Sequence, residues 1–502
     1  MTGSRNAMDK TLRFTLDGRP IEARLGETVL EAATRAGVMI PHYCWHQALG
    51  NPGNCRMCIV EVEGAPKPQV SCRLPAREGL VVRSASPAAR RAQCSALEFH
   101  LVDHPLDCPV CDQSGECGLQ DYYMDIGRYK SAMREDKAHA GKRLALGPHI
   151  MLDQERCIMC TRCTRFVGQV SKSHELGIFG RGHRQAVDLV PGRALDNPYS
   201  GNLADICPVG ALTDRDFRFQ VRVWYLDSTE SICPGCSRGC NIFVHTSTRR
   251  PWQNQGRRLA RLKPRFSPEV NGHWICDEGR YGFLDFDSKR LGKVMRLKPV
   301  SEELPWDRAA QEVAAALRRK PVEGLAVAAS GALSNEDWLA FKELFVDTLQ
   351  ARRFLFAPEP DQAGTEDQLL RRREKTPNLE GGKALGFGTK IESMGWDALA
   401  RDIEAGKVWG LYVIDRDPAQ AWGDRSRELL ERLDLLIYQG PRQCLAGELA
   451  HYRLPATAWL EEEGHFTNFQ GKVQGYRSAL QPLGAAKPDW AIFADLERRF
   501  KP

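Results

Sequence analysis

The stretch from His104 to Cys117 constrains this chain more than any other. It reads HPLDCPVCDQSGEC, so four ligand-type side chains occur in the pattern His-x3-Cys-x2-Cys-x5-Cys. Four such ligands within fourteen residues indicate one shared metal centre. The candidate ligands are His104, Cys108, Cys111 and Cys117. A structural zinc site uses the same residue types, but the cysteine groups on both sides of the stretch favour iron and sulfur.

The segment before this stretch predicts a β-grasp domain of the ferredoxin type. Apolar and polar residues alternate on both sides of Asp17-Gly18, which favours a hairpin over residues 11–25. Thr28 and Glu31 form the pattern of a capping box, so a short helix is expected next. A cysteine-bearing loop then follows the helix, as in ferredoxins.

The four cysteines of that first group have the spacing C-x10-C-x2-C-x13-C. Plant-type [2Fe–2S] ferredoxins use C-x4-C-x2-C…C, so the first gap is longer here by six residues. We expect a [2Fe–2S] cluster, and a four-cysteine zinc site is the alternative. The expected ligands are Cys44, Cys55, Cys58 and Cys72.

A helix is expected from Pro87 onward, with Cys94, Leu97 and Leu101 on one face. Cys94 is therefore expected in the core and not at a metal.

The third group, CIMCTRC at 157–163, has the strict double x2 spacing of iron–sulfur proteins. Bacterial ferredoxins place a fourth Cys-Pro three residues later, and none occurs there. The remaining candidate is the cysteine of CPVGAL, which is also followed by proline. We expect one [4Fe–4S] cluster on Cys157, Cys160, Cys163 and Cys207.

The fourth group combines CPGCSRGC with the cysteine of WICDEG, in the pattern C-x2-C-x3-C-x35-C. Its candidate ligands are Cys233, Cys236, Cys240 and Cys276. Seven basic residues and no acidic one lie between Arg249 and Arg265. A solvated hairpin or a surface for an acidic partner is favoured there over a nucleic-acid site, because aromatic residues are sparse.

This partition uses fifteen cysteines and one histidine in four complete sets and leaves Cys94 and Cys444 over. A disulfide framework is the other use of seventeen cysteines, but it is typical of small secreted chains. This chain has 502 residues and begins without the apolar region of a secretory signal. The sequence contains no apolar run of about 18 residues, so it predicts no membrane-spanning helix. The net charge of +6 is too diffuse to indicate nucleic acid.

Beyond residue 300 the ligand-type clusters end. Short apolar runs at 324–330, 408–415 and 433–439 alternate with helical patterns, which predicts an α/β domain with a mainly parallel sheet. The turn-rich segment 464–476, GHFTNFQGKVQGY, is expected on a loop.

Together these motifs resemble the large iron–sulfur subunit of bacterial NADH:quinone oxidoreductase, respiratory complex I. The resemblance rests on HPLDCPVCDQSGECGLQD, CIMCTRCTRF, NPYSGNLADICPVGAL and CPGCSRGCNI in this order. SNEDWLAFKELF, PNLEGGKALGF and GHFTNFQGKVQ resemble the molybdopterin oxidoreductase superfamily more weakly. The part after Cys276 is shorter than in the family, so we expect a compact domain without molybdopterin.

The resemblance implies five domains. They are a [2Fe–2S] β-grasp domain over 10–90, a [4Fe–4S] domain with one histidine over 91–130, a [4Fe–4S] ferredoxin-like domain over 131–226, a four-cysteine [4Fe–4S] domain of molybdopterin-oxidoreductase type over 227–295, and a compact α/β domain over 296–502.

It also implies a relay subunit with one [2Fe–2S] and three [4Fe–4S] clusters and no catalytic site of its own. Its partners would be a flavin-bearing NADH-oxidising subunit and the downstream iron–sulfur and quinone-site subunits of the peripheral arm. No nucleic acid is expected. The location would be cytoplasmic, on the inner face of the bacterial plasma membrane, with membrane contact only through partners. The alternatives are a subunit of an NAD-linked hydrogenase or formate dehydrogenase, and a zinc-stapled interaction scaffold.

Overall fold

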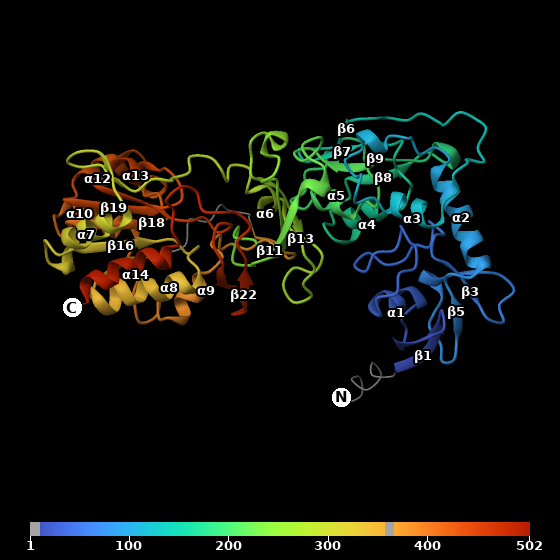
Figure 1. Ribbon diagram of the computed structural model, residues 1–502, viewed down its shortest axis with the longest axis horizontal. Coiled ribbons are helices and arrows are strands. Elements are labelled where there is room, and N and C mark those ends of the chain that lie inside the picture. The colour runs from blue at the N-terminus through green and yellow to red at the C-terminus, as the bar shows by residue number, and fades with distance from the viewer. Residues whose placement is uncertain (1–10, 357–365, 502) are drawn as a thin grey trace. The chain divides into compact units, whose positions relative to one another are not determined.

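The computed structural model describes residues 11–356 and 366–501, and the chain forms two compact units that join between Tyr225 and Leu226. Figure 1 shows both units and labels many of their elements.

The first unit opens with a five-stranded sheet in the order β2-β1-β5-β3-β4. Asp17 and Gly18 both have positive φ and form the turn between the first two strands, as the sequence predicts. Thr28 caps α1 (Val29–Arg35) in a complete capping box with Glu31, which is also as predicted. The strands are β1 (Thr11–Leu16), β2 (Arg19–Arg24), β3 (Ile59–Val62), β4 (Gln69–Val70) and β5 (Val81–Arg83).

Helix α2 (Pro87–Leu101) connects this sheet to the central stretch. Cys94 is half-buried, so its expected place in the core is wrong. The buried position beside it belongs to Gln93, whose amide donates to the carbonyls of Ile59 and Ser84. The stretch itself contains a short 3-10 turn, Cys108–Val110, and ends in α3 (Gly118–Ile126).

The rest of the first unit is built from small elements. Two strand groups, β10-β7-β6 and the hairpin β8–β9, flank two short helices. These elements are β6 (Leu144–Ala145), β7 (Ile150–Leu152), β8 (Leu176–Phe179), β9 (Ala186–Leu189), β10 (Leu212–Asp214), α4 (Arg162–Gln169) and α5 (Asn202–Ile206).

The second unit begins with an antiparallel three-stranded sheet, followed by α6 (Asp277–Tyr281). Its strands are β11 (Asp227–Ile232), β12 (Asn241–Thr246) and β13 (Leu259–Pro264). The basic segment lies in the connection between β12 and β13 and in β13 itself, so the predicted hairpin is present there.

A seven-stranded sheet in the order β15-β14-β20-β19-β18-β16-β17 forms the centre of the second unit. The five strands from β20 to β17 pair in parallel, as predicted, and β14 and β15 add an antiparallel edge. The strands are β14 (Met295–Arg296), β15 (Glu302–Glu303), β16 (Leu325–Ala329), β17 (Arg353–Leu355), β18 (Gly410–Ile414), β19 (Leu435–Gly440) and β20 (Tyr452–Pro455).

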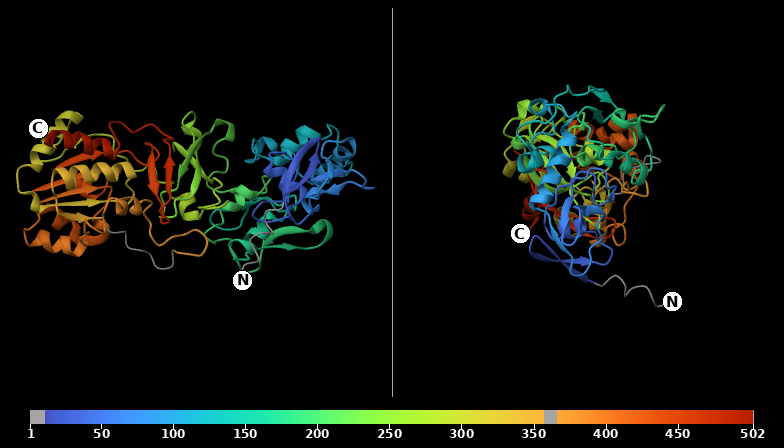
Figure 2. Two further views of the ribbon diagram at one scale, coloured as in Figure 1. Left: turned by 90° about the horizontal axis from the view of Figure 1, so that it is seen from below. Right: turned by 90° about the vertical axis from the view of Figure 1, so that its right-hand side faces the viewer.

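Helices cover both faces of this sheet (Figures 1 and 2). One core packs Trp338, Phe341 and Phe493 against one face, and the other packs Leu399 and Leu429 against the opposite face. The helices are α7 (Trp306–Leu317), α8 (Asn335–Phe341), α9 (Leu379–Ala384), α10 (Trp396–Glu404), α11 (Ala419–Trp422), α12 (Ser426–Glu431), α13 (Leu445–Leu449) and α14 (Asp489–Phe500).

The segment 464–476 is not the expected loop. It forms the antiparallel hairpin β21 (Gly464–Thr467) and β22 (Val473–Tyr476). The prediction is wrong because Phe466 and Tyr476 pack against Ile232, a contact between distant parts of the sequence.

Candidate metal centres

The first cysteine group lies in the loops of the β-grasp sheet, and its four thiols are buried as two close pairs. Cys44 pairs with Cys55, and the Cys44 N–H donates a hydrogen bond of 3.4 Å to the Cys55 Sγ. Cys58 pairs with Cys72 in the same way. The hydrogen bond that the Cys55 thiol donates lowers the pKa of Cys44 and so favours the thiolate form of Cys44.

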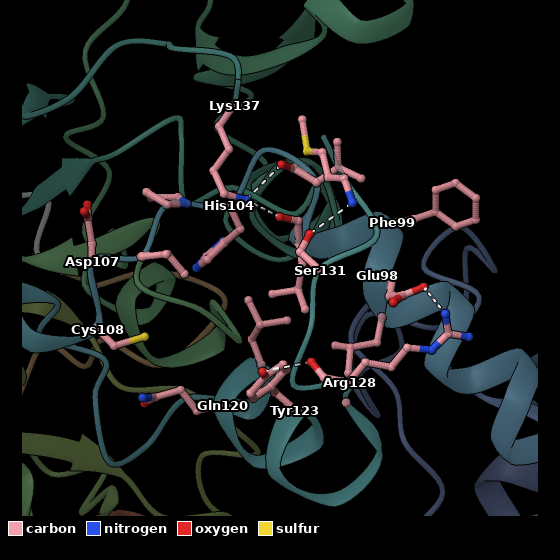
Figure 3. A pocket seen from close by; sticks show the side chains of 18 of the residues that line it. Glu98, Phe99, His104, Asp107, Cys108, Gln120, Tyr123, Arg128, Ser131 and Lys137 are labelled. Atoms are coloured by element: carbon pink, nitrogen blue, oxygen red, sulfur yellow. Dashed lines mark hydrogen bonds and ion pairs between the residues drawn. The ribbon is translucent and has the colours of Figure 1, made fainter. Parts of the chain in front are cut away.

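The four candidate ligands of the central stretch line one cavity of about 920 Å³. Cys111 and Cys117 are buried, whereas Cys108 is exposed. Figure 3 shows His104 and Cys108 on the cavity wall together with Gln120 from α3. Helix α2 ends at Leu101, three residues before His104, and Cys117 occupies the N-cap position of α3.

His104 has the surroundings of a ligand. Its Nδ1 is buried and has no hydrogen-bond partner within the described residues, while the ring bonds the main chain of Arg156. Burial lowers the pKa of His104 to about 4, so the imidazole is neutral at physiological pH. Metal-bound histidines are neutral and use the other ring nitrogen for such a hydrogen bond.

The segment after α3 covers part of this cavity (Figure 3). Lys137 donates to the carbonyls of Leu101 and Val102 at 2.7 and 2.9 Å. Arg128 forms an ion pair with Glu98 at 3.3 Å. The cavity is therefore bounded by α2, α3 and the segment 127–137.

The third group surrounds a small cavity of about 20 Å³. Left-handed backbone at Met159 and Thr161 turns the chain between successive cysteines, and α4 begins directly afterwards. Ile158, Val209 and Leu212 complete an apolar wall. Burial raises the pKa of Cys157 to about 12 and that of Cys160 to about 11. The lining ligands are Cys157, Cys160, Cys163 and Cys207.

The fourth group belongs to the second unit and is buried throughout. Cys276 caps α6, and its Sγ accepts a hydrogen bond of 3.3 Å from the Gly279 N–H. A Cβ on Gly279 would lie 2.9 Å from the Cys233 Sγ and 3.5 Å from the Cys276 Sγ, so this position must lack a side chain. The buried thiols are those of Cys233, Cys236, Cys240 and Cys276.

Two arginines of α4 join the first and third groups. Arg165 donates to the carbonyls of both Cys44 and Cys160. Arg162 donates to the carbonyls of Trp45 and Ile206 at 2.7 and 3.1 Å. The loops that carry these two groups are therefore in direct contact.

The turn after Cys207 joins the third group to the central stretch. A Cβ on Gly210 would overlap the Sγ of Cys111, so the backbone of this turn packs directly on that thiol. The Gly118 N–H donates to the Pro208 carbonyl at 3.2 Å. The third group thus touches both of the others, although it follows them in sequence.

These connecting residues were missed by the sequence reasoning, which considered only the ligands. A signal was available, because Arg156, Arg162 and Arg165 lie within or next to the CIMCTRC motif, and Gly210 is three residues after Cys207. Over the ranges that the structure describes, no three His, Cys, Asp or Glu side chains are grouped closely enough to form a single-ion site.

Family models match most of the chain in four segments. The 2Fe-2S iron-sulfur cluster binding domain matches residues 9–87, and the NADH-ubiquinone oxidoreductase-G iron-sulfur binding region matches 93–132. The ferredoxin-like domain of NADH-quinone oxidoreductase subunit 3 matches 147–213, and molybdopterin oxidoreductase matches 380–499.

Similar proteins of known name include subunits of NADH-quinone and NADH-ubiquinone oxidoreductases. The G-type subunit of NADH-quinone oxidoreductase from Rickettsia bellii is 30% identical, over 97% of this chain and 86% of that protein. The mitochondrial 78 kDa subunit of NADH-ubiquinone oxidoreductase of Neurospora crassa is 39% identical, over 66% of this chain and 44% of that protein. A chain in the crystal structure of an NAD+-reducing [NiFe]-hydrogenase in the H2-reduced state is 35% identical, over 42% of this chain and 91% of that chain, with a TM-score of 0.38. The identity to the Rickettsia protein and the shared coverage together show that this chain belongs to the family of G-type subunits of NADH-quinone oxidoreductase.

Proposed function

We propose that this chain is the iron–sulfur relay subunit of an NADH:quinone oxidoreductase. Its residues hold one [2Fe–2S] and three [4Fe–4S] clusters, each of which takes up and releases one electron at a time when bound. Family membership supports the activity of the complex. The contact between the three ligand-bearing loops of the first unit is the observation that carries the relay.

Electron transfer between clusters requires short separations and exclusion of water. Arg165 bonds the first and third groups together, and Gly210 packs the third group on Cys111. Most of the ligands are buried, so the protein replaces water around them. The chain thus gathers three candidate sites into one continuous region of the first unit.

The arrangement of the first group supports a two-iron cluster. Two iron atoms need two thiolates each, and the thiols of this group are already paired two by two. A single tetrahedral zinc ion would instead draw four sulfurs equally toward one point. We assign the two pairs, Cys44 with Cys55 and Cys58 with Cys72, to separate irons.

We further propose that the α/β domain holds no pterin. Ligands of open parallel sheets bind outside the carboxyl ends of the strands. At that end of β19, Gln439 is buried and bonded to Asp489 and Tyr412. The carboxyl groups of the buried Asp489 and Asp337 and of the half-buried Glu462 also lie in this region. Carboxyl groups supply no positive charge for the phosphate of a molybdopterin, whether they are protonated or not.

The partners follow from the family. We propose that a flavin-bearing NADH-oxidising subunit supplies the electrons, and that downstream iron–sulfur and quinone-site subunits accept them. None of the helices within the described ranges has the length and apolar character needed to cross a membrane. From the family we propose attachment to the inner face of the bacterial plasma membrane through partner subunits. For the domains we propose the limits that the sequence predicts.

Anaerobic purification followed by iron, sulfide, zinc and molybdenum analysis tests this function. We expect about 14 iron atoms per chain, with EPR signals from a [2Fe–2S] and from [4Fe–4S] clusters after dithionite reduction. Stoichiometric zinc with little iron would reject the relay. Molybdenum or a pterin in the native protein would reject the proposal for the α/β domain alone.

A further inference from the structure

We propose that Arg156 raises the reduction potential of the cluster held by His104, Cys108, Cys111 and Cys117, acting as a fixed positive charge at the wall of that site. The inference rests on the proposed function, because it assumes that a [4Fe–4S] cluster occupies these ligands. Arg156 itself belongs to the segment of the third group, next to Cys157. It therefore links the environment of one cluster to the chain segment of another.

The Arg156 side chain lies at the cavity of His104 and its three cysteines, although Arg156 is next to Cys157 of the third group in sequence. Its side chain lines the cavity of about 920 Å³ that the four ligands share. The backbone of Gly210 lies beside both groups, because a Cβ there would be in ordinary contact with the Arg156 Cδ at 3.6 Å and would overlap the Cys111 Sγ. The Arg156 main chain also bonds the His104 ring.

The guanidinium group is buried and fixed in place. Arg156 is only 5% exposed, which is rare for arginine and indicates paired charge. Its Nη2 and Nε donate to the Asp107 Oδ2 at 2.9 and 3.3 Å, and its Nε lies 3.3 Å from the Asp153 Oδ2. Lys142 also pairs with Asp107, at 2.8 Å. The Arg156 guanidinium group is therefore held in place, and solvent ions screen its charge less than they would at an exposed position.

A fixed charge at this position changes the energy of an added electron. Reduction makes the cluster and its ligands more negative by one charge, so a nearby cation stabilises the reduced form and an anion destabilises it. Arg156 lines the same cavity as the Cys111 thiol, and Asp107 accepts hydrogen bonds from its guanidinium group. Removing the two charges should thus move the potential in opposite directions.

The test is a redox titration of the full chain, purified anaerobically with its clusters and followed by low-temperature EPR. The signal of the central cluster is first identified as the one that His104→Ala removes. Arg156→Gln should shift its one-electron equilibrium about tenfold toward the oxidised form, which corresponds to about 59 mV. Arg156→Lys should restore most of the wild-type potential, and Asp107→Asn should raise it. Arg134→Gln, at an exposed position of the segment covering the cavity, removes the same charge and should leave the potential unchanged.

Each outcome decides one question. If no signal depends on His104, the assignment of the cluster fails, and the proposal for Arg156 fails with it. If the signal is present but Arg156→Gln leaves its potential unchanged, or if Arg156→Lys lowers it as much, only the proposal for Arg156 is overturned. If Arg156→Gln loses iron, its potential cannot be compared, and the result for Asp107→Asn is used instead. An electrostatic role of the Arg156–Asp107 pair predicts a higher potential in Asp107→Asn, whereas a purely structural role predicts no rise.

Discussion

Glu461 and Glu462 are neighbours in sequence, but their carboxyl groups bind different kinds of partner. Glu461 accepts hydrogen bonds from Arg290 at 3.1 Å and from Arg258 at 2.9 Å. Glu462 instead accepts from the Thr457 hydroxyl at 2.5 Å and from the Tyr476 hydroxyl at 3.4 Å. One carboxylate is neutralised by two cations, while the other lies among neutral hydroxyl groups.

This contrast predicts that the second unit loses stability as the pH rises. Burial raises the pKa of Glu462 to about 8 and raises the pKa values of Asp337 and Asp489. The folded state then binds more protons than the unfolded state, so stability falls from about pH 4 until it levels off near the folded pKa. Each titrating group contributes on the order of 1.4 kcal/mol per pH unit within its window.

Hydrogen exchange of α14 and of the hairpin β21–β22, corrected for intrinsic rates, measures this effect at pH 6 and pH 8.5. Asp489 begins α14, and the Trp490 N–H donates to Asp337 at 2.8 Å, so protection of this helix should fall at the higher pH. Glu462→Gln should weaken that pH dependence. Glu461→Gln should lower protection at both pH values, because it leaves Arg290 buried without its charge partner. Equal protection at both pH values in the wild-type chain contradicts the prediction.

Gly210→Ala should damage the central metal site. The new methyl group would occupy the space of the Cys111 Sγ, so that the thiol or the turn after Cys207 must shift. Such overpacking costs about 1–3 kcal/mol and displaces a ligand. Iron content and the EPR signal that depends on His104 are the measurements. Gly395→Ala is the matched control, because no atom lies within 4 Å of its Cβ position. Full iron content in the Gly210 variant would show that the close approach is not needed.

Cys207→Ala should remove one [4Fe–4S] cluster, although this cysteine is far in sequence from Cys163. The expected loss is about four iron atoms per chain, with the [2Fe–2S] signal retained. Cys94→Ala and Cys444→Ala are the controls, because the partition of ligands leaves these two thiols over. An equal loss of iron in either control would mean that the partition is wrong.

The sequence predicted those parts of the fold that depend on local chemistry. The turn at Asp17-Gly18 and the capping box of Thr28 need only residues close in the chain, and both are present. The apolar strands of the α/β domain were also predicted, because buried parallel strands are apolar at every position. Cys94 was misplaced, because an amphipathic pattern does not show that Gln93 finds two carbonyl partners in the interior.

For the metal sites, the sequence predicted candidate ligands but not the residues that connect one ligand group to another. The spacing of the cysteines suggests four sets, and the set memberships remain predictions until metal analysis. What the sequence could not supply is the contact between sets. Arg156 and Asp107 are 49 residues apart, and Arg165 and Cys44 are 121 residues apart. Such pairings follow from tertiary packing, which a local pattern does not encode.

The strongest test of the central site compares His104→Cys with His104→Ala. We expect imidazole to be the fourth ligand, because its Nδ1 is buried, the ring is neutral, and all three cysteines of the set line the same cavity. A thiolate in its place would keep a four-iron cluster but add one negative charge, which stabilises the oxidised form and lowers the midpoint potential. Alanine supplies no ligand, so the cluster should be lost or become labile. EPR-monitored redox titration and iron analysis measure both outcomes. If both variants keep the wild-type signal and potential, His104 is not a ligand, and an outside group must complete the site.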